Sequence, residues 1–350
     1  MDKIPLVKLF VTGRPKPRIR SGFWLQLLCP HTDVLKLHNV KPDLVDSDIK
    51  LFVKAQLSDI ANNRSNCSFM EDWPSPLDID ALCKKAAGFF IYASTAVKFI
   101  ASRHHSPDKS LALIISLPQN TFHEGKSGIN LLYTQVLEQA FCDVDQDFYT
   151  HFKLVLGAVL LIFNSLPINA LSDLLGNCGT PYEVYSALRP LHSLLLIPDS
   201  KKDPVRVFHK SFPDFIMDPK QCVDHRLFID PLIYHREILF SCLNVMRRGL
   251  RRNICKLDDY ILLSKVKDLP SRRATYIGDA LGYACCCWTT HLVNTAGCSI
   301  SIEEVQKAVD EFFTTNFLFW VEVLSLTGNL EAGVHSLNKI QQWYTLVGYL

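Results

Sequence analysis

Apolar residues recur every three or four positions along most of this 350-residue chain, and that spacing places them on one face of an α-helix. A helix capped by Asp46 would direct Ile49 inward. Ser75-Pro76 suits the cap and first turn of another helix, whose apolar stripe continues to Ile100. Residues 39–146 are therefore predicted to be all-helical. Further helices in this region are predicted over 106–117 and 128–141.

The pattern changes after residue 147. The spacing predicts a helix over 148–163, a short helix that ends at Leu175, and a third helix that opens on the capping box Thr180 to Glu183. Two short apolar strands, 194–197 and 205–208, follow and are joined by a charged turn. Three helices followed by a hairpin are typical of a winged-helix domain.

Beyond residue 218 the apolar spacing is again helical, and the segment is rich in aromatic residues. Runs such as Phe317 to Trp320 are typical of a core between packed helices. Near the start of the chain, by contrast, residues 6–11 and 33–38 are predicted to be two short strands. The helices predicted after residue 218 cover 232–252, 271–295, 302–326 and 331–347.

The charge balance argues against a general attraction to nucleic acid or membrane, because 37 basic residues stand against 35 acidic ones. The longest strongly apolar run, 154–163, is about half the length that spans a bilayer. The first residues lack a signal-peptide pattern. We therefore expect a cytoplasmic protein without a membrane partner.

No metal or hydrolase centre is recognisable. The 12 cysteines include no C-x-x-C pair, so zinc-ligand spacing is absent, and Cys285 to Cys287 are expected to be small core residues. No H-E-x-x-H or G-x-S-x-G motif occurs. Gly125 to Ser127 come nearest to a phosphate-binding loop, but Asn120 stands in place of its first glycine. We expect no catalytic residue and no metal in this chain.

Three motifs carry a family resemblance. They are Leu9 to Pro15, which is an apolar strand ending in Thr-Gly-Arg-Pro, then Cys83 to Ala93, and Val207 to Phe215. With these motifs and this order of elements, the chain resembles the NACHT branch of the STAND P-loop NTPases. The match is closest to the large NACHT proteins of mushroom-forming fungi and covers roughly residues 4–218.

The resemblance implies nucleotide contacts for three residues. Arg14 matches the residue that reads the terminal phosphate, a task that suits a guanidinium because its donors fork onto phosphate oxygens. Gly88 matches the glycine of a helix-capping motif that packs on the adenine, with Phe90 in place of the family's proline. His209 matches the histidine that touches the ADP diphosphate in the resting state, with Lys210 in place of a common acid.

The resemblance also implies a mainly α fold that begins with the remnant of a parallel α/β nucleotide-binding sheet. Because the phosphate-binding loop and the magnesium-holding acid are not found, we expect the C-terminal part of a signalling ATPase, without catalysis of its own. Its partners would be proteins, including full-length NACHT relatives. Alone it would bind no cofactor, whereas an intact relative would hold ATP or ADP with magnesium. The expected divisions are 1–40 (sheet remnant), 41–146 (helical lid), 147–218 (winged helix) and 219–350 (helical C-terminal domain).

Other functions stay open. The winged helix could bind DNA, although residues 148–218 hold six basic and six acidic residues rather than a basic face, so nucleic acid is the less favoured partner. The chain could also be half of a split nucleotide switch whose P-loop half is encoded separately. A basic cluster, Arg247-Arg248 with Arg251-Arg252, could meet anionic lipid or RNA, or it could simply complement a helix C-terminus.

Overall fold

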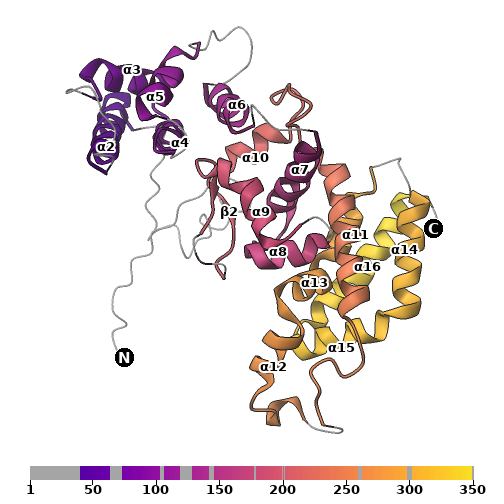
Figure 1. Cartoon of the computed structure of the whole chain (residues 1–350). Coiled ribbons are helices and arrows are strands. Elements are labelled where there is room, and N and C mark those ends of the chain that lie inside the picture. Colours follow the sequence, from indigo (N-terminus) through magenta and orange to yellow (C-terminus); the bar gives the residue numbers. More distant parts are fainter. Residues whose placement is uncertain are drawn as a thin grey trace, which may run out of the picture. The chain divides into compact units, whose positions relative to one another are not determined.

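The computed structural model describes most of the chain after residue 39 (Figure 1). The described part is mainly helical and contains one two-stranded sheet. The strands predicted over 6–11 and 33–38, and with them the expected sheet remnant, lie outside the described residues. Contacts divide the chain into residues 1–48 and residues 49–350, and the features below belong to the second unit. The described residues are 40–63, 73–102, 106–118, 128–141, 146–176, 179–198, 200, 202–258, 262–297 and 302–348.

α2 (Pro42–Asn63) begins before Asp46, so the predicted cap at Asp46 was wrong, but Ile49 is buried as predicted. Ile49, Val53 and Leu57 are fully buried, and their separation by four positions puts them on one face of the helix. Beside this face, Lys50 forms an exposed ion pair with Asp80 at 2.6 Å, whereas Leu51 is 68% exposed.

The stripe predicted from Ser75 to Ile100 is divided between two helices. α3 (Pro76–Ala86) begins with a capping box formed by Ser75 and Asp78, whose side chains accept backbone N–H groups reciprocally. It ends where Ala87, with a φ of 46°, and Gly88, with a φ of 78°, adopt left-handed conformations. The prediction of one helix was wrong because apolar spacing does not report such a turn. α4 (Phe90–Ile100) and α5 (Pro107–Ser116) follow.

A set of helices and a hairpin occupy the middle of the chain. The predicted start of α9 is confirmed, because the Thr180 backbone N–H donates to the Glu183 carboxylate at 2.6 Å. In the hairpin, Leu195 lies opposite Val207 in an antiparallel pair. The elements follow the order expected of a winged helix, although that assignment and the domain limits stay predictions. The elements are α6 (Gly128–Ala140), α7 (Gln146–Leu161), α8 (Ile168–Leu175), α9 (Pro181–Leu188), η4 (Arg189–Leu191), β1 (Leu195–Leu196) and β2 (Arg206–Val207).

α10 (Ser211–Ile216) is a short helix that the apolar spacing did not predict. It buries Phe212, Phe215 and Ile216. Two aromatic residues of the third family motif, Phe212 and Phe215, are therefore packed into a core, whereas His209, Lys210 and Asp214 are exposed.

The C-terminal helices surround one central member. α13 packs against α11, α15 and α16, and also against α8 (Figure 1). The helices predicted over 271–295 and 302–326 are each divided in two, the first before Gly278, where φ is 63°, and the second at Asn316. The elements are α11 (Pro231–Gly249), η5 (Leu263–Lys265), α12 (Leu269–Tyr276), α13 (Gly278–Asn294), α14 (Ile302–Thr315), α15 (Phe317–Thr327) and α16 (Leu330–Leu346).

Aromatic side chains fill this C-terminal core, as predicted. The rings of Trp288 and Trp320 meet edge to face at 6.4 Å, and Phe312 lies 4.7 Å from Trp288. Trp320 Nε1 donates to the backbone oxygen of Cys285 at 2.8 Å. Burial raises the pKa of the Cys287 thiol to about 11, so it stays protonated and packs as a core residue.

A buried polar network connects α11, α13 and the end of α7. The Nδ1 atoms of His235 and His291 are 2.8 Å apart, and the Tyr283 hydroxyl lies 2.6 Å from His291 Nε2. The backbone N–H of Phe163 donates to the Tyr283 hydroxyl at 3.3 Å. Because Phe163 lies between α7 and α8, the network joins the middle of the chain to the C-terminal helices.

Candidate functional site

Two of the three residues matched to nucleotide contacts lie in the described part of the chain. Gly88 occupies the turn between α3 and α4, and His209 lies between β2 and α10. Arg14 lies outside the described residues, as does the segment Gly125 to Ser127. Within the described residues, the candidate site therefore consists of two positions, Gly88 and His209, and the side chains around them.

His209 stands in a relay of hydrogen bonds. Its Nδ1 accepts the Ser211 backbone N–H at 3.1 Å and lies 2.7 Å from the Ser211 hydroxyl, which in turn is 2.6 Å from the hydroxyl of Tyr133. Because Nδ1 is an acceptor, the neutral imidazole carries its proton on Nε2. The Ser211 hydroxyl then donates a hydrogen bond to His209 Nδ1 and accepts one from the Tyr133 hydroxyl.

The relay ends in the packed interface between α6 and α10. The ring of Tyr133, on α6, lies 5.5 Å from the rings of both Phe212 and Phe215, and burial raises the pKa of the Tyr133 hydroxyl. On the same helix, the Asn130 amide donates to the Gln221 side chain at 3.0 Å. The position of His209 is thereby tied to the docking of α6.

α4 also reaches the end of the hairpin. The Lys98 Nζ atom lies 3.1 Å above the ring of Phe208, the residue before His209. A ring nitrogen of His192 lies 3.2 Å from the Lys98 backbone oxygen. Burial lowers the pKa of Lys98, but the ring face supplies a partial negative charge that favours the ammonium.

Gly88 owes its place to backbone conformation and not to close packing. A Cβ atom added at Gly88 would meet nothing within 4 Å, so the residue does not serve to bring two helices together. Its φ of 78° is a conformation that favours glycine. Phe90, which replaces the family's proline, packs edge to face on Phe52 at 6.1 Å and is 45% exposed.

The structure does not bring Gly88 and His209 into one cluster. Gly88 precedes the first turn of α4, whereas Lys98, beside Phe208, is in its last turn. Ten residues of helix correspond to about 15 Å. α4 therefore separates the two positions, and only one end of it touches the segment that carries His209.

Sequence reasoning missed Tyr133, Ser211 and Lys98. Ser211 was inside the third motif, so its hydroxyl two residues after His209 was a usable signal. No local pattern pointed to Tyr133, because it is 78 positions away from Ser211 in the chain.

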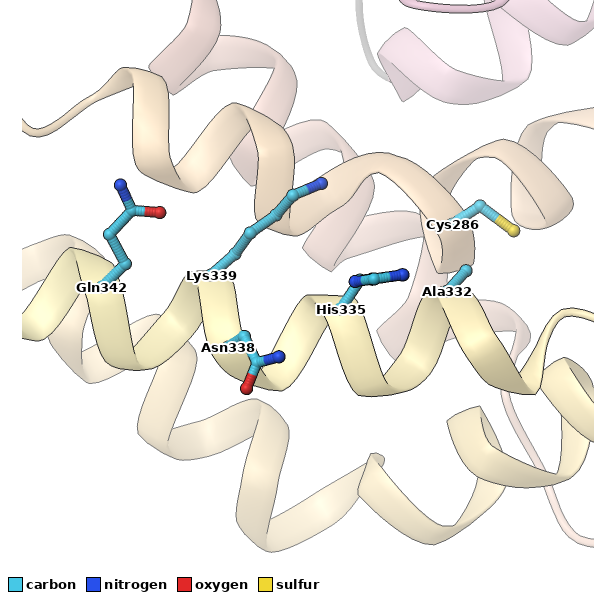
Figure 2. Close-up of a pocket in the computed structure, with 6 residues that line it drawn as sticks. All are labelled: Cys286, Ala332, His335, Asn338, Lys339 and Gln342. Atoms are coloured by element: carbon cyan, nitrogen blue, oxygen red, sulfur yellow. The ribbon is translucent and has the colours of Figure 1, made fainter.

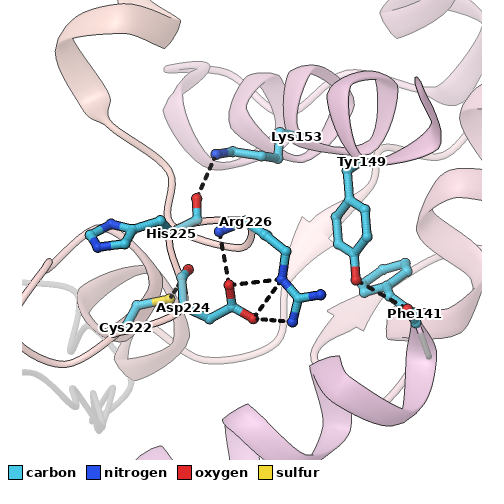
Figure 3. Close-up of polar contacts among 7 residues, drawn as sticks. All are labelled: Phe141, Tyr149, Lys153, Cys222, Asp224, His225 and Arg226. Atoms are coloured by element: carbon cyan, nitrogen blue, oxygen red, sulfur yellow. Dashed lines mark hydrogen bonds and ion pairs between the residues drawn. The ribbon is translucent and has the colours of Figure 1, made fainter. Parts of the chain in front are cut away.

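The segment between α10 and α11 is fastened to α7 (Figure 3). Arg226 donates to the Asp224 carboxylate through Nε at 3.1 Å and Nη2 at 2.8 Å, and this lowers the pKa of Asp224. The Lys153 ammonium of α7 donates to the His225 backbone oxygen at 3.2 Å. The arrangement fixes a connecting segment and offers no nucleophile, since the neighbouring Cys222 has its pKa raised by burial to about 11.

Two hollows beside α16 lie far from this site along the chain. One of about 500 Å³ lies beside α16 and is lined by polar side chains of that helix, including His335 and Lys339, with Cys286 of α13 (Figure 2). Lys339 is engaged, because its Nζ donates to the Thr290 hydroxyl at 2.7 Å. Burial raises the pKa of Cys286, so this thiol is not activated. No group of three or more metal-ligating side chains occurs among the described residues.

Comparison with known proteins gives a distant relative. The chain is 24% identical over 292 residues to the vegetative incompatibility protein HET-E-1 of Podospora anserina. The match covers 77% of this chain but 20% of the relative, so the chain spans about a fifth of that protein's length. This likeness supports a relationship to the NACHT family. No family model and no solved structure matches the chain, and no helix in the described residues is long and apolar enough to cross a membrane.

Proposed function

We propose that the segment from α3 to α10 is the phosphate-reporting end of a NACHT-type signalling switch. The observation that carries the proposal is the relay from His209 through Ser211 to Tyr133 on α6. The distant likeness to HET-E-1 fits a signalling or regulatory role. In this role α6 would be the lid-side helix that responds to the histidine.

The protonation of His209 supplies the switch. A phosphate near Nε2 favours the doubly protonated imidazolium, because opposite charges attract. Nδ1 of the imidazolium carries a hydrogen, so it can no longer accept from the Ser211 backbone N–H and hydroxyl. Nucleotide would therefore reverse the relay and change the docking of α6, which is a population shift between two arrangements.

We further propose that the chain alone does not hydrolyse ATP. Phosphoryl transfer needs a backbone cradle, a lysine and a magnesium-holding acid, and the sequence contains no G-x-x-x-x-G-K-[ST] motif. Nucleotide with magnesium would then be held only together with a partner that supplies these groups. Full-length NACHT relatives in the cytoplasm, or a separately encoded P-loop half, are such partners.

The charge of α9 argues against DNA binding as a second function. The helix before the hairpin, α9, would be the one to enter a groove, yet Pro181–Leu188 contains no lysine or arginine. Proteins that read DNA present a basic face whose binding falls steeply with salt.

A nucleotide titration tests the proposal. Fluorescent ADP with magnesium is titrated into the chain alone and into the chain mixed with a P-loop-containing NACHT relative, up to about millimolar concentration, which corresponds to weak binding of about 4 kcal/mol. We expect no saturable binding by the chain alone. In the mixture, we expect this chain to change the binding of ADP, and we expect His209→Ala to abolish that change. His225→Ala, at another exposed histidine, is the matched control. Chain-dependent binding that survives His209→Ala would overturn the role of His209, whereas binding by the chain alone would show that no partner is needed to hold the nucleotide.

Tyr133→Phe tests the relay itself. The variant keeps the ring that packs on Phe212 but removes the hydroxyl that donates a hydrogen bond to Ser211. We expect a loss of about 1 kcal/mol in the free energy of unfolding and altered ¹⁵N chemical shifts of the His209 imidazole, which report its tautomer. Tyr182→Phe is the control, because Tyr182 is 76% exposed. Unchanged His209 shifts in Tyr133→Phe would show that the two side chains are not coupled.

A further inference from the structure

The end of α11 and the turn after it concentrate positive charge. Arg247 and Arg248 lie in the last turn of α11, and Arg251 and Arg252 follow it, all four with exposed side chains. Arg247 is 4.0 Å from the Glu311 carboxylate. Within the described residues, the other three arginines have no carboxylate at ion-pair distance. The macrodipole acts only within the last turn of a helix, so it does not account for Arg251 and Arg252.

Three exposed lysines belong to the same end of the C-terminal helices. Lys256 comes directly after the arginine turn, and Lys265 and Lys267 lie in and after η5. Arg272 brings the two ends of this segment together, because its Nη1 donates to the Lys256 backbone oxygen at 2.6 Å and its Nε to the Asp268 carboxylate at 2.7 Å. The lysines are therefore held next to the arginine turn.

The turn itself is rigidly supported. The Glu322 carboxylate of α15 accepts the backbone N–H groups of Asn253 and Ile254 at 3.1 and 3.0 Å. Glu322 is thus occupied by backbone donors and not by an arginine. Over residues 247–273 the sequence has nine basic and three acidic residues, whereas the whole chain has 37 and 35. The excess charge is local and is presented on a fixed frame.

An exposed apolar side chain accompanies this charge. Leu262 is 62% exposed and lies between Lys256 and Lys265 in the chain. A leucine that projects among cations gains little from an aqueous polyanion such as RNA. At a lipid surface it enters the apolar layer while the cations meet anionic headgroups.

Among the described residues, an aromatic side chain near these lysines also disfavours nucleic acid. Single-stranded nucleic acid stacks its bases on open aromatic faces. Tyr276 is half-buried, and the Lys256 ammonium lies over its ring at 5.0 Å. That face is already covered.

We propose that this basic end, defined as Arg248, Arg251, Arg252, Lys256, Lys265 and Lys267 with Leu262 among them, docks on the surface of an anionic membrane. Docking would be peripheral, through side chains at the surface. This inference departs from the sequence-based expectation of no membrane partner, and it is independent of the nucleotide switch.

Vesicle co-sedimentation tests it with the full chain. Vesicles of phosphatidylcholine alone are compared with vesicles that also contain phosphatidylserine. We expect binding only to the anionic vesicles, and we expect it to weaken as salt is added. Each basic residue near such a surface contributes about fivefold in affinity, so Arg251→Glu combined with Arg252→Glu should weaken binding by at least about 25-fold. Leu262→Asp should also weaken binding.

The control reverses two exposed lysines elsewhere, Lys202→Glu with Lys220→Glu, and should leave vesicle binding nearly unchanged. All variants alter exposed side chains, and circular dichroism checks that each is folded. Equal binding to neutral vesicles, or anionic binding that the double arginine variant retains, would overturn the proposal. A fluorescent RNA oligonucleotide provides the last arm. RNA binding that is lost in the arginine variant, in the absence of any vesicle binding, would assign the basic end to nucleic acid.

Discussion

His235 and His291 are buried as neutral bases, and their hydrogen bonds have one direction. The Tyr283 oxygen accepts the Phe163 backbone N–H, so the hydroxyl proton of Tyr283 points to His291 Nε2. His291 then carries its own proton on Nδ1 and donates it to His235 Nδ1. A further proton on His235 Nδ1 would place its N–H directly opposite the N–H of His291 Nδ1, so the hydrogen bond between the two rings would be lost. Burial lowers the pKa of His235 to about 4 and that of His291 to about 3, with the His235 charge adding to the second shift.

The pair therefore makes stability sensitive to acid. In the unfolded chain both histidines titrate near about 6.5, so below that pH the unfolded state binds more protons than the folded state. We expect the contribution of the pair to be constant above about pH 6.5 and to be lost as the pH falls towards 4. By pH 4 the loss should be about 3 kcal/mol for each histidine. Urea unfolding at several pH values measures it.

Carboxylates titrate in the same pH range, so the contribution of the histidine pair is found by comparing the pH dependence of stability in a variant and in the parent chain. His291→Gln should unfold more easily at pH 7 but lose less stability between pH 6.5 and 4 than the parent chain. His335→Gln, at a largely exposed histidine, should follow the parent at every pH. Parallel curves for the parent and His291→Gln would contradict the assignment to this pair.

Among the elements, the turn between α3 and α4 depends on backbone conformation. Gly88 and Gly282 both have room for a methyl group, since an added Cβ meets nothing within 4 Å at Gly88 and only Ile277 at 4.0 Å at Gly282. At Gly88 the left-handed φ makes Gly88→Ala cost about 1–2 kcal/mol. Within α13, Gly282→Ala should stabilise the chain by about 1 kcal/mol. Thermal unfolding measures the change in melting temperature of each variant. Changes of the same sign in Gly88→Ala and Gly282→Ala would refute the backbone explanation.

The same turn shows what could be predicted from the sequence. The helices themselves, the cap at Thr180 and the aromatic core followed from spacing and from known cap chemistry, which are local. The breaks at Gly88 and Asn316 did not, because apolar residues continue at helical spacing on both sides of each break. Of the candidate site, His209 came from a motif, but its partner Tyr133 did not, because contacts between distant residues leave no local pattern.

At the scale of the whole molecule, the predicted limit between residues 218 and 219 falls where the structure is closely connected. α7 packs against α11, and α8 against α11 and α13. Two hydrogen bonds cross the same limit, one from Lys153 to the His225 backbone oxygen and one from the Phe163 backbone N–H to the Tyr283 hydroxyl. The segments on its two sides thus share one core, and we expect them to lose structure together.

Trp320→Ala tests this cooperativity. Trp320 is 2% exposed in the core around α13, and its removal should cost about 3–5 kcal/mol. If the core is shared, amide hydrogen exchange should accelerate in α7 as much as in α13. Leu318→Ala, on the same helix but at a residue that is 75% exposed, should leave both unchanged. Faster exchange in α13 with unaltered exchange in α7 would instead mean that the middle of the chain folds independently. A signal at His209 could then not reach the C-terminal helices through this core.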